Sequence, residues 1–268
     1  MLTLPNTGRR RPTLQQLRSS RHDQGPDPIP EPTRPVDSSR DFICPTVTPL
    51  YYCPIYQQLT DLQRRTYNQI TAMSFNELIA LFEQIGSAVL ASMLRRGIVD
   101  PDLTACLHRF IEDEHDHIER WRTLNVLSDP AYTNGSYRIN VKLARLRHRL
   151  VRLARRPERW TAVFWLMLLQ EERSLDLSRR CARSGASLDP CYAQMYAHHM
   201  RDEVRHVQLD WHLIDRYYAK QSTAMQRANA ELLRVLVSRF FLPPLHSAKR
   251  VVHLWMQRQP ELWPFRQT

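Results

Sequence analysis

The sequence has little glycine and no paired cysteines, and both shortages restrict its fold. Only 6 of its 268 residues are glycine, and alternating strand-like segments bounded by turn residues are scarce, which favours a mostly helical chain. The five cysteines form no CxxC pair, and an odd number without a pattern is typical of reduced thiols in a cytoplasmic protein. We therefore exclude a disulfide-stapled secreted fold and expect an all-α protein.

Long apolar runs are also missing from the sequence. The longest, AVFWLMLL at residues 162–169, is far too short to span a bilayer. The first residues, MLTLPNTGRRRPTLQQL, carry an arginine cluster with no apolar segment after it, so neither a Sec nor a twin-arginine signal is recognisable. We expect a cytoplasmic protein that makes no use of a membrane.

Acidic residues are outnumbered, with 27 Asp and Glu against 38 Lys and Arg, a net charge of +11. Part of this excess lies in residues 140–156 (NVKLARLRHRLVRLARR), where arginines surround an apolar stripe. The simplest interpretation is an amphipathic surface helix. The alternatives are a docking site for an acidic partner, such as a substrate carrier protein or a reductase, and last a nucleic acid. No nucleic-acid-binding motif accompanies the charge, so we expect no such partner.

Proline is concentrated at the start of the chain, where half of the 18 prolines precede residue 50. Because apolar residues are few there, we expect residues 1–48 to form a disordered or loosely docked arm, and residues 49–268 to form a helical bundle domain. Ser74 and Glu77 have the spacing of a capping box that begins a helix ended by Gly97. The further predicted helices cover about 60–71, 102–124, 140–156, 160–184, 189–218, 221–240 and 244–258.

The segment HHMRDEVRH at residues 198–206 combines three histidines with two acids. His199, Glu203 and His206 are spaced i, i+4 and i+7, which puts them on one face of a helix. Apolar residues continue that face, so it points into the core, whereas His198 and Arg205 are expected to be solvated. Burying two histidines and a glutamate without a partner or a metal would cost several kcal/mol. The stripe therefore predicts a metal site.

A second acidic segment, CLHRFIEDEHDHIERW, contains two overlapping ExxH spacings. One is Glu112 with His115, and the other is Glu114 with His117. Glu114 and His117 share a stripe with Phe110, whereas the other acids fall among arginines, so we take this pair as inward. Both segments then read D-E-x-x-H on an inward helical face, a repetition that chance rarely produces.

A helical bundle that binds two metals in this way needs one more glutamate from each of two other helices. In the helix that precedes Gly97, Glu77 is assigned to the cap, and Glu83 lies mid-helix among apolar residues. In the later helix, Glu171 and Glu172 are both candidates. Glu171 is more nearly opposite the charged side, so we favour it and keep Glu172 open.

The candidate ligands are thus Glu83, Glu114, His117, Glu171 or Glu172, Glu203 and His206, with His199 as an additional imidazole. Carboxylates and imidazoles without a thiolate suit iron or manganese better than a structural zinc site. Four carboxylates also balance the charge of two divalent ions, which removes the penalty of burying them.

The pattern E…DExxH…E…DExRH resembles ferritin-like di-iron carboxylate proteins, and DEVRH looks like the second motif of their oxygenase branch. His199, one turn before Glu203, resembles the p-aminobenzoate N-oxygenase (AurF-like) family, which uses a third histidine ligand. The likeness covers roughly residues 50–240 and implies a ferritin-like four-helix bundle core with additional helices. It also implies that Asp113 and Asp202 orient the histidines of the opposite motif.

The resemblance implies two iron ions that react with dioxygen, through a peroxo-diferric species, to N-oxygenate an amine or amino-acid-type substrate in natural product biosynthesis. The first alternative is C-hydroxylation of a free or carrier-bound substrate, and the second is a non-catalytic iron-binding or storage bundle. The expected partners are the substrate, an electron donor (a reductase, a ferredoxin or a small reductant) and an acidic carrier protein, with a homodimer as one expected assembly.

Overall fold

The computed structural model describes residues 11–19, 36–132, 137–143, 151–152, 155–240 and 245–262, and these residues are mostly helical. Within those ranges, the one strand-like pairing is an isolated bridge between Asp41 and Leu188. The α-helices are α1 (Leu14–Ser19), α2 (Pro54–Gln58), α3 (Asp61–Arg95), α4 (Pro101–Ser128), α6 (Ala162–Arg183), α7 (Pro190–Leu213), α8 (Thr223–Phe240) and α9 (Leu245–Arg258). Short 3-10 turns occur at Pro45–Val47, Pro49–Tyr52 and Gly185–Ser187, and a π-helical turn, Ile214–Tyr218, continues α7.

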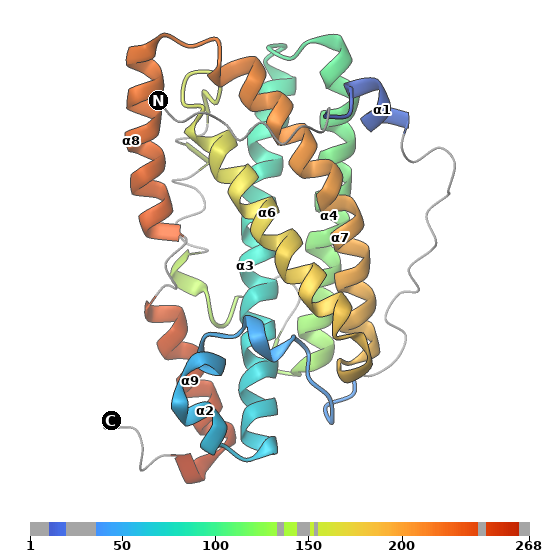
Figure 1. The fold of residues 1–268 in the computed structure, drawn as a ribbon, viewed down its shortest axis with the longest axis vertical. Coiled ribbons are helices and arrows are strands. Elements are labelled where there is room, and N and C mark those ends of the chain that lie inside the picture. Colours follow the sequence, from blue (N-terminus) through green and yellow to red (C-terminus); the bar gives the residue numbers. More distant parts are fainter. Residues whose placement is uncertain are drawn as a thin grey trace.

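The four long helices α3, α4, α6 and α7 form a four-helix bundle, and the other described helices lie on its outside (Figure 1). α3 packs along α4 and α6 packs along α7, while contacts of α4 with α7 and of α3 with α6 close the bundle. Each helix buries its apolar side toward the bundle axis, as amphipathic sequences require. The prediction of an all-α, ferritin-like fold is confirmed.

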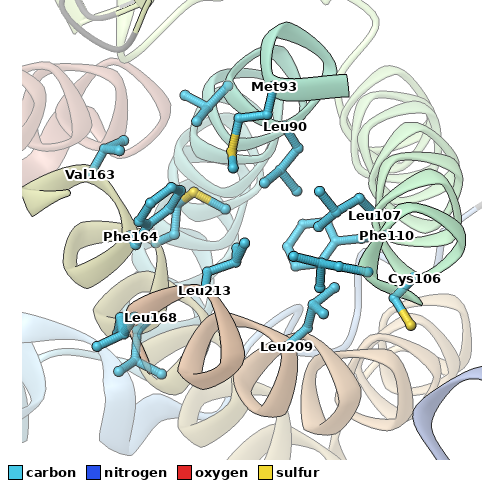
Figure 2. Packing of buried hydrophobic residues seen from close by; sticks show 14 of the residues in the cluster. Leu90, Met93, Cys106, Leu107, Phe110, Val163, Phe164, Leu168, Leu209 and Leu213 are labelled. Atoms are coloured by element: carbon cyan, nitrogen blue, oxygen red, sulfur yellow. The ribbon is translucent and has the colours of Figure 1, made fainter. Parts of the chain in front are cut away.

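The apolar core consists of two main clusters that lie at different levels of the bundle. Figure 2 shows the first, in which Leu90, Phe110, Phe164 and Leu213 come from the four bundle helices. The second cluster lies nearer the other end of each helix and includes the fully buried Trp121 of α4. Between them, each helix has a short stretch whose inward residues are polar. This level of the bundle is where a site can form.

α3 begins earlier than predicted, and Ser74 and Glu77 do not form its cap. The helix starts after Thr60, which accepts a hydrogen bond from the Gln63 backbone N–H while the Gln63 side chain accepts from the Thr60 N–H. This is a complete capping box. Residues 61–85 contain no glycine or proline. The helix predicted at 60–71 and the helix predicted to begin at Ser74 therefore form one helix, and the S-x-x-E spacing falls in its interior.

Glu77, which the sequence assigned to a helix cap, is buried in the interior of α3. Its carboxylate accepts hydrogen bonds from the backbone N–H groups of Arg138, Ile139 and Asn140 and from the hydroxyl of Tyr132. These N–H groups belong to the bend that precedes the helical residues 141–143, so Glu77 satisfies buried backbone donors that no helix pairs. Glu77 therefore supports the fold and is not available to a metal.

Part of the segment expected to be an arm packs on the bundle. Residues 36–48 contribute Phe42 and Ile43 to the core, and Phe42 stacks on Tyr192 of α7 at 4.6 Å between ring centroids. α1 contacts α4 and α7 (Figure 1). The proline-rich composition of the N-terminal segment gives no sign of these few apolar contacts. For this reason, the boundary predicted near residue 48 does not mark the start of the packed chain.

The outer helices enlarge the bundle without entering its centre. α2 and α9 pack at one end through Tyr56 and Trp255, and α8 packs against α6. α3 is long and apolar enough to cross a membrane, but 56% of its most apolar stretch is buried within the protein, as expected for the central helix of a bundle. The predicted basic helix of residues 140–156 lies largely outside the described residues.

Candidate metal centre

Polar side chains occupy one level of the bundle, with contributions from all four helices. They are Glu83 of α3, Glu114 and His117 of α4, Glu171 of α6, and His199, Glu203 and His206 of α7. Between 0 and 9% of each residue is exposed. Burying four carboxylates beside three imidazoles is strongly unfavourable unless their charges are compensated. Their position at one level therefore requires a compensating charge.

These seven residues form two groups of four that share Glu203. The His-rich cage comprises Glu83, His117, His199 and Glu203, and the Glu-rich cage comprises Glu114, Glu171, Glu203 and His206. Within each cage, one potential ligand atom per residue lies within 4.8 Å of all the others. Such groups of oxygen and nitrogen atoms can each hold one metal ion.

The two oxygens of Glu203 face different cages. Glu203 Oε1 lies 2.8 Å from His199 Nε2 and 3.6 Å from His117 Nδ1, whereas Oε2 lies 3.5 Å from His206 Nδ1. Within the His-rich cage, Glu83 Oε1 also lies 3.1 Å from His199 Nε2. Glu203 would therefore offer one oxygen to each cage.

Two histidines are held by acids from the opposite helix. His117 of α4 directs Nδ1 to the cage, and its Nε2 lies 3.1 Å from Asp202 Oδ2 of α7. His206 of α7 directs Nδ1 to Glu114, 2.8 Å away, and its Nε2 lies 3.5 Å from Asp113 Oδ2 of α4. An acid on the outer nitrogen sets the ring orientation and raises its basicity toward a metal. The two D-E-x-x-H segments thus orient each other's histidine.

His199 is oriented by a different kind of partner. Its Nε2 points at Glu83 and Glu203, while its Nδ1 lies 3.0 Å from the hydroxyl of Ser178 on α6. A serine hydroxyl accepts or donates and carries no charge, so His199 lacks the acid that the other two histidines have. Ser178 could not be identified from the sequence, because an isolated serine on a helix gives no recognisable signal.

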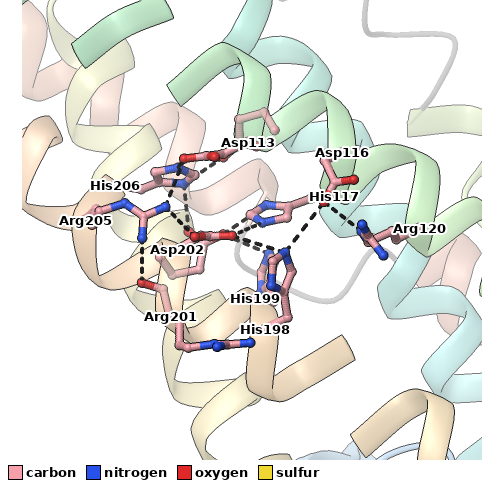
Figure 3. Close-up of polar contacts among 12 residues, drawn as sticks. Asp113, Asp116, His117, Arg120, His198, His199, Arg201, Asp202, Arg205 and His206 are labelled. Atoms are coloured by element: carbon pink, nitrogen blue, oxygen red, sulfur yellow. Dashed lines mark hydrogen bonds and ion pairs between the residues drawn. The ribbon is translucent and has the colours of Figure 1, made fainter. Parts of the chain in front are cut away.

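Arg205 and His198, expected to be solvated, belong to the network around the cages (Figure 3). The Arg205 guanidinium pairs with Asp202 and lies 3.1 Å from Asp113 Oδ2. His198 is buried, with Nε2 3.3 Å from Asp202 and 3.5 Å from Asp116. Helical spacing alone put both residues on an outer face. The close approach of α4 covers that face, and this contact cannot be read from one helix.

Burial and mutual repulsion strongly perturb the carboxylates. Burial, with the nearby charge of Glu203, raises the pKa of Glu171 well above its usual value, and burial with Glu83 raises that of Glu114 to about 7. Burial also acts to raise the pKa of Glu203, but the charges of His199 and His206 act against it, and the pKa of Glu203 is lowered well below its usual value. Without an ion, protons must therefore neutralise part of this site.

Many polar atoms at the centre make no well-directed hydrogen bond among the residues that the structure describes, and meet only charged atoms of neighbouring acids and histidines. They are Glu83 Oε2, both carboxylate oxygens of Glu114 and of Glu203, His117 Nδ1 and both nitrogens of His206. Native proteins rarely leave such atoms without good hydrogen bonds, and a group of them at one level could hold an ion. The set contains oxygen and imidazole nitrogen but no thiolate, so these residues fit a pair of iron or manganese ions.

A pocket of about 290 Å³ lies between α3 and α6 and reaches the cages. Its wall includes Glu83 and Glu171, one ligand candidate from each cage. The α3 side is apolar and includes Phe75 and Phe82, whereas the α6 side is mostly polar, from Gln170 to Arg180. A small molecule held in this pocket would therefore contact both cages.

The structure places the alternatives that the sequence kept open in different surroundings. Glu171 is buried and belongs to the Glu-rich cage, whereas its neighbour Glu172 is exposed. In the same way, Glu112 and His115 are exposed on α4 and do not face the cages. The two adjacent glutamates of α6 differ by about 100° around the helix, which is enough to place one in the site and the other in solvent.

Asp210 is a further buried acid, outside the set of ligands predicted from the sequence. It lies on α7 one turn beyond His206, on the same inward face, and is 0% exposed. Neither of its carboxylate oxygens has a hydrogen-bond partner among the described residues. Burial raises its pKa well above the usual value, so the folded protein favours the neutral acid. The i+4 spacing from His206 was the available signal.

The fold and the site define a ferritin-like bundle with a buried carboxylate and histidine centre able to hold metal. A family model described as p-aminobenzoate N-oxygenase AurF matches residues 8–259. The chain therefore belongs to this family. The match begins before residue 50 and ends after residue 240, so it extends beyond the range that the sequence motifs indicated. A comparison with curated proteins finds no match.

Proposed function

We propose that the protein is a di-iron oxygenase that uses dioxygen to N-oxygenate an amine or amino-acid-type substrate. The observation that carries this proposal is the pair of cages sharing Glu203, with Glu83 and Glu171 also lining a pocket. Membership of the p-aminobenzoate N-oxygenase family supports the reaction class. A third imidazole, His199, is part of the His-rich cage, which agrees with that membership.

Two iron ions held by the seven cage residues would supply the activation of dioxygen. The surrounding residues keep these ligands in place: Asp113, Asp202 and Ser178 hold the outer nitrogens of the three histidines. In the overall reaction, one oxygen atom is transferred to the substrate nitrogen and the other leaves as water. Two electrons and two protons must come from a donor, such as a reductase, a ferredoxin or a small reductant.

The pocket between α3 and α6 is the proposed substrate site. Its apolar wall, with Phe75, Ile79 and Phe82, suits a flat apolar ring. Its position against Glu83 and Glu171 would bring the reacting group of such a molecule next to both cages, and close positioning of this kind accounts for much of enzymatic rate enhancement. The presence of this pocket also disfavours an iron-storage bundle, which has no use for a pocket of this size.

The test uses iron-loaded protein with dioxygen, a reductant and a panel of aromatic amines and amino acids. Mass spectrometry after labelling with ¹⁸O₂ is expected to show labelled hydroxylamine, nitroso or nitro products. Glu114→Ala removes a carboxylate of the Glu-rich cage and is expected to abolish product formation. An exposed variant on the same helix, Glu119→Gln, is the control and is expected to retain it.

Three outcomes would contradict N-oxygenation. Label found on carbon would indicate a hydroxylase, and conversion of added iron to a mineral without labelled product would indicate storage. Product formation that survives in Glu114→Ala would show that the chemistry does not use the Glu-rich cage.

A further inference from the structure

Two aromatic side chains lead from the His-rich cage into the second apolar cluster. The ring of Trp121 on α4 lies 5.2 Å, between centroids, from the ring of His199, a member of that cage. The ring of Tyr196 on α7 lies 5.6 Å from that of Trp121. All three side chains are 0% exposed, and both spacings are those of packed aromatic pairs. An indole and a phenol therefore form one continuous contact that starts at a cage residue.

Packing alone does not account for the chemical type of these two rings. Neither Nε1 of Trp121 nor the hydroxyl oxygen of Tyr196 makes a well-directed hydrogen bond among the described residues, although both atoms are buried. Buried tryptophan and tyrosine usually find such a partner, and a buried polar atom without one destabilises the fold. Phenylalanine at position 196 would fill nearly the same space without this cost. The property that indole and phenol have, and that phenylalanine lacks, is ready loss of an electron.

The path continues from Tyr196 to two cysteines, which we call the thiol pair (Cys44 and Cys181). Burial, together with the neighbouring Cys181 thiol, raises the pKa of the Tyr196 hydroxyl well above its usual value. The backbone N–H of Cys44 donates to Cys181 Sγ at 3.4 Å, so the two cysteines are in contact. Cys44 is 6% exposed, and its Sγ accepts from the Ser184 hydroxyl at 3.3 Å. The path therefore ends at two adjacent thiols, one of which reaches the edge of the protein.

The surroundings of Cys181 favour oxidation from inside the protein over oxidation from solution. Burial raises the pKa of its thiol to about 12, so the thiolate that dissolved oxidants attack is scarce. A tyrosine that has lost an electron and its proton removes both from a neighbouring thiol in one step, and this reaction needs no thiolate. Tyr196 lies next to the thiol pair and is the residue able to do so.

We propose that Trp121 and Tyr196 conduct electrons from the thiol pair to the metal centre when dioxygen oxidises that centre in the absence of substrate. This inference rests on the proposed function, because it needs iron in the cages. The two thiols lose two electrons and two protons and form one S–S bond, while dioxygen takes up both and becomes hydrogen peroxide. Unproductive oxidation then ends in a disulfide, which a thiol reductant reverses, and not in damage to the cage residues.

Peptide mass spectrometry tests the path without measuring turnover. Iron-loaded protein is exposed to dioxygen with no amine present, and the cross-linked peptide of the thiol pair is quantified after digestion without a reductant. Tyr196→Phe removes one oxygen atom from the path, and Trp121→Phe removes the indole. Tyr67→Phe and Trp255→Phe are the matched controls, because both residues are buried in the separate cluster that joins α2, α3 and α9. Thermal unfolding and the iron content are measured for every variant.

We expect the cross-linked peptide in the unmodified protein and in both controls. It should be lost in Tyr196→Phe and Trp121→Phe although iron is still bound, and it should be absent from metal-free protein and from iron-loaded protein kept anaerobic. A packing role for Tyr196 would change thermal stability and leave the cross-link intact.

Three results would overturn the proposal. They are a cross-link that persists in Tyr196→Phe, a cross-link that forms equally without iron, and iron-loaded unmodified protein that forms none. An unmodified protein that binds no iron would overturn the proposed function as well, and the iron measurement identifies that case. Because no amine is present, a failure to N-oxygenate amines would contradict the proposed function alone and leave this result unaffected.

Discussion

Glu203 is the residue on which both cages depend. Its two oxygens face different groups of ligands, and each group contains three other side chains among the residues that the structure describes. The histidines follow a common rule, in which one ring nitrogen faces a cage and the other has a polar partner. Orientation by such partners lets a site form before the metal arrives, because the rings need not reorder on binding.

The adjacent glutamates of α6 allow a matched test at the level of single residues. We expect Glu171→Gln to reduce the number of bound Fe(II) ions from two to one, because the amide is a poor ligand for the Glu-rich cage. Glu172→Gln changes an exposed neighbour and is expected to bind two. Iron analysis after anaerobic loading and gel filtration measures both, and the reverse pattern would show that Glu172 is the ligand.

Arg205 is expected to matter for stability although it contacts no cage atom. It is the cation between Asp113 and Asp202, and only 20% of its side chain is exposed. Arg205→Met leaves two buried acids without this countercharge, which should lower the free energy of unfolding by about 3 kcal/mol. Urea denaturation measures the change. Arg201→Met, at an exposed position one turn earlier, should change it by less than about 0.5 kcal/mol, and equal effects would contradict the assignment.

Asp210 predicts a specific pH dependence. Burial raises its folded-state pKa well above the unfolded value, so its contribution to stability is present below the unfolded pKa and is lost as pH rises through the folded pKa. Asp210→Asn carries no such proton. The metal-free variant should therefore gain stability relative to the unmodified protein as pH rises from 5 to 8, measured by urea denaturation. An unchanged difference over that range would mean that Asp210 is ionised in the folded protein.

At the level of elements, α4 and α7 explain why the sequence revealed so much of the site. Each presents its D-E-x-x-H segment on one face, and helical spacing identifies such a face without further information. Glu83 was recognisable as an acid among apolar neighbours. The roles of Ser178 and Arg205 were not recognisable, because they depend on which helix packs over them. Helical periodicity alone also did not decide between the adjacent residues Glu171 and Glu172.

The start of α7 could be predicted from the sequence, whereas the start of α3 could not. Asp189 followed by Pro190 begins α7 as predicted, with Asp189 accepting from two backbone N–H groups. The spacing of Ser74 and Glu77 equally fits a cap, but it lies inside α3, whose start is capped by Thr60. A short capping motif indicates a helix start only where the preceding helix has ended. The sequence between residues 71 and 74 contains no residue that would end a helix.

α1 provides a prediction at this scale, because it covers one side of the centre. The Cys106 thiol of α4 donates to the Leu14 carbonyl of α1, and Arg11 pairs with Asp215 and lies 4.5 Å from the Trp211 ring centroid. Removing residues 1–19 should expose Cys106 and increase its rate of labelling by a thiol reagent at least tenfold. Mass spectrometry of labelled peptides measures this rate.

Cys181, fully buried in the second apolar cluster, is the internal control and should label at an unchanged rate. Faster labelling of both thiols would indicate general loosening of the fold. An unchanged rate for Cys106 would show that α1 does not protect it.

At the scale of the whole molecule, the bundle places a polar level between two apolar clusters. These clusters exclude water from the ends of the centre, which strengthens electrostatic interactions within it. The pocket between α3 and α6 gives a small molecule access to it from one side. The all-α fold was predictable because helical periodicity and the two metal motifs agree, whereas the pocket was not, since it is lined by residues from separate segments.

We propose that two metal ions share Glu203, and the number of Fe(II) ions bound per chain tests this proposal most directly. Anaerobic titration of the metal-free protein should give two ions per chain for the unmodified sequence. Because both cages use Glu203, Glu203→Ala should lose tight binding at both positions, whereas loss of a ligand from one cage should spare the other. Fewer than two ions in the unmodified protein, or two ions retained in Glu203→Ala, would contradict the account.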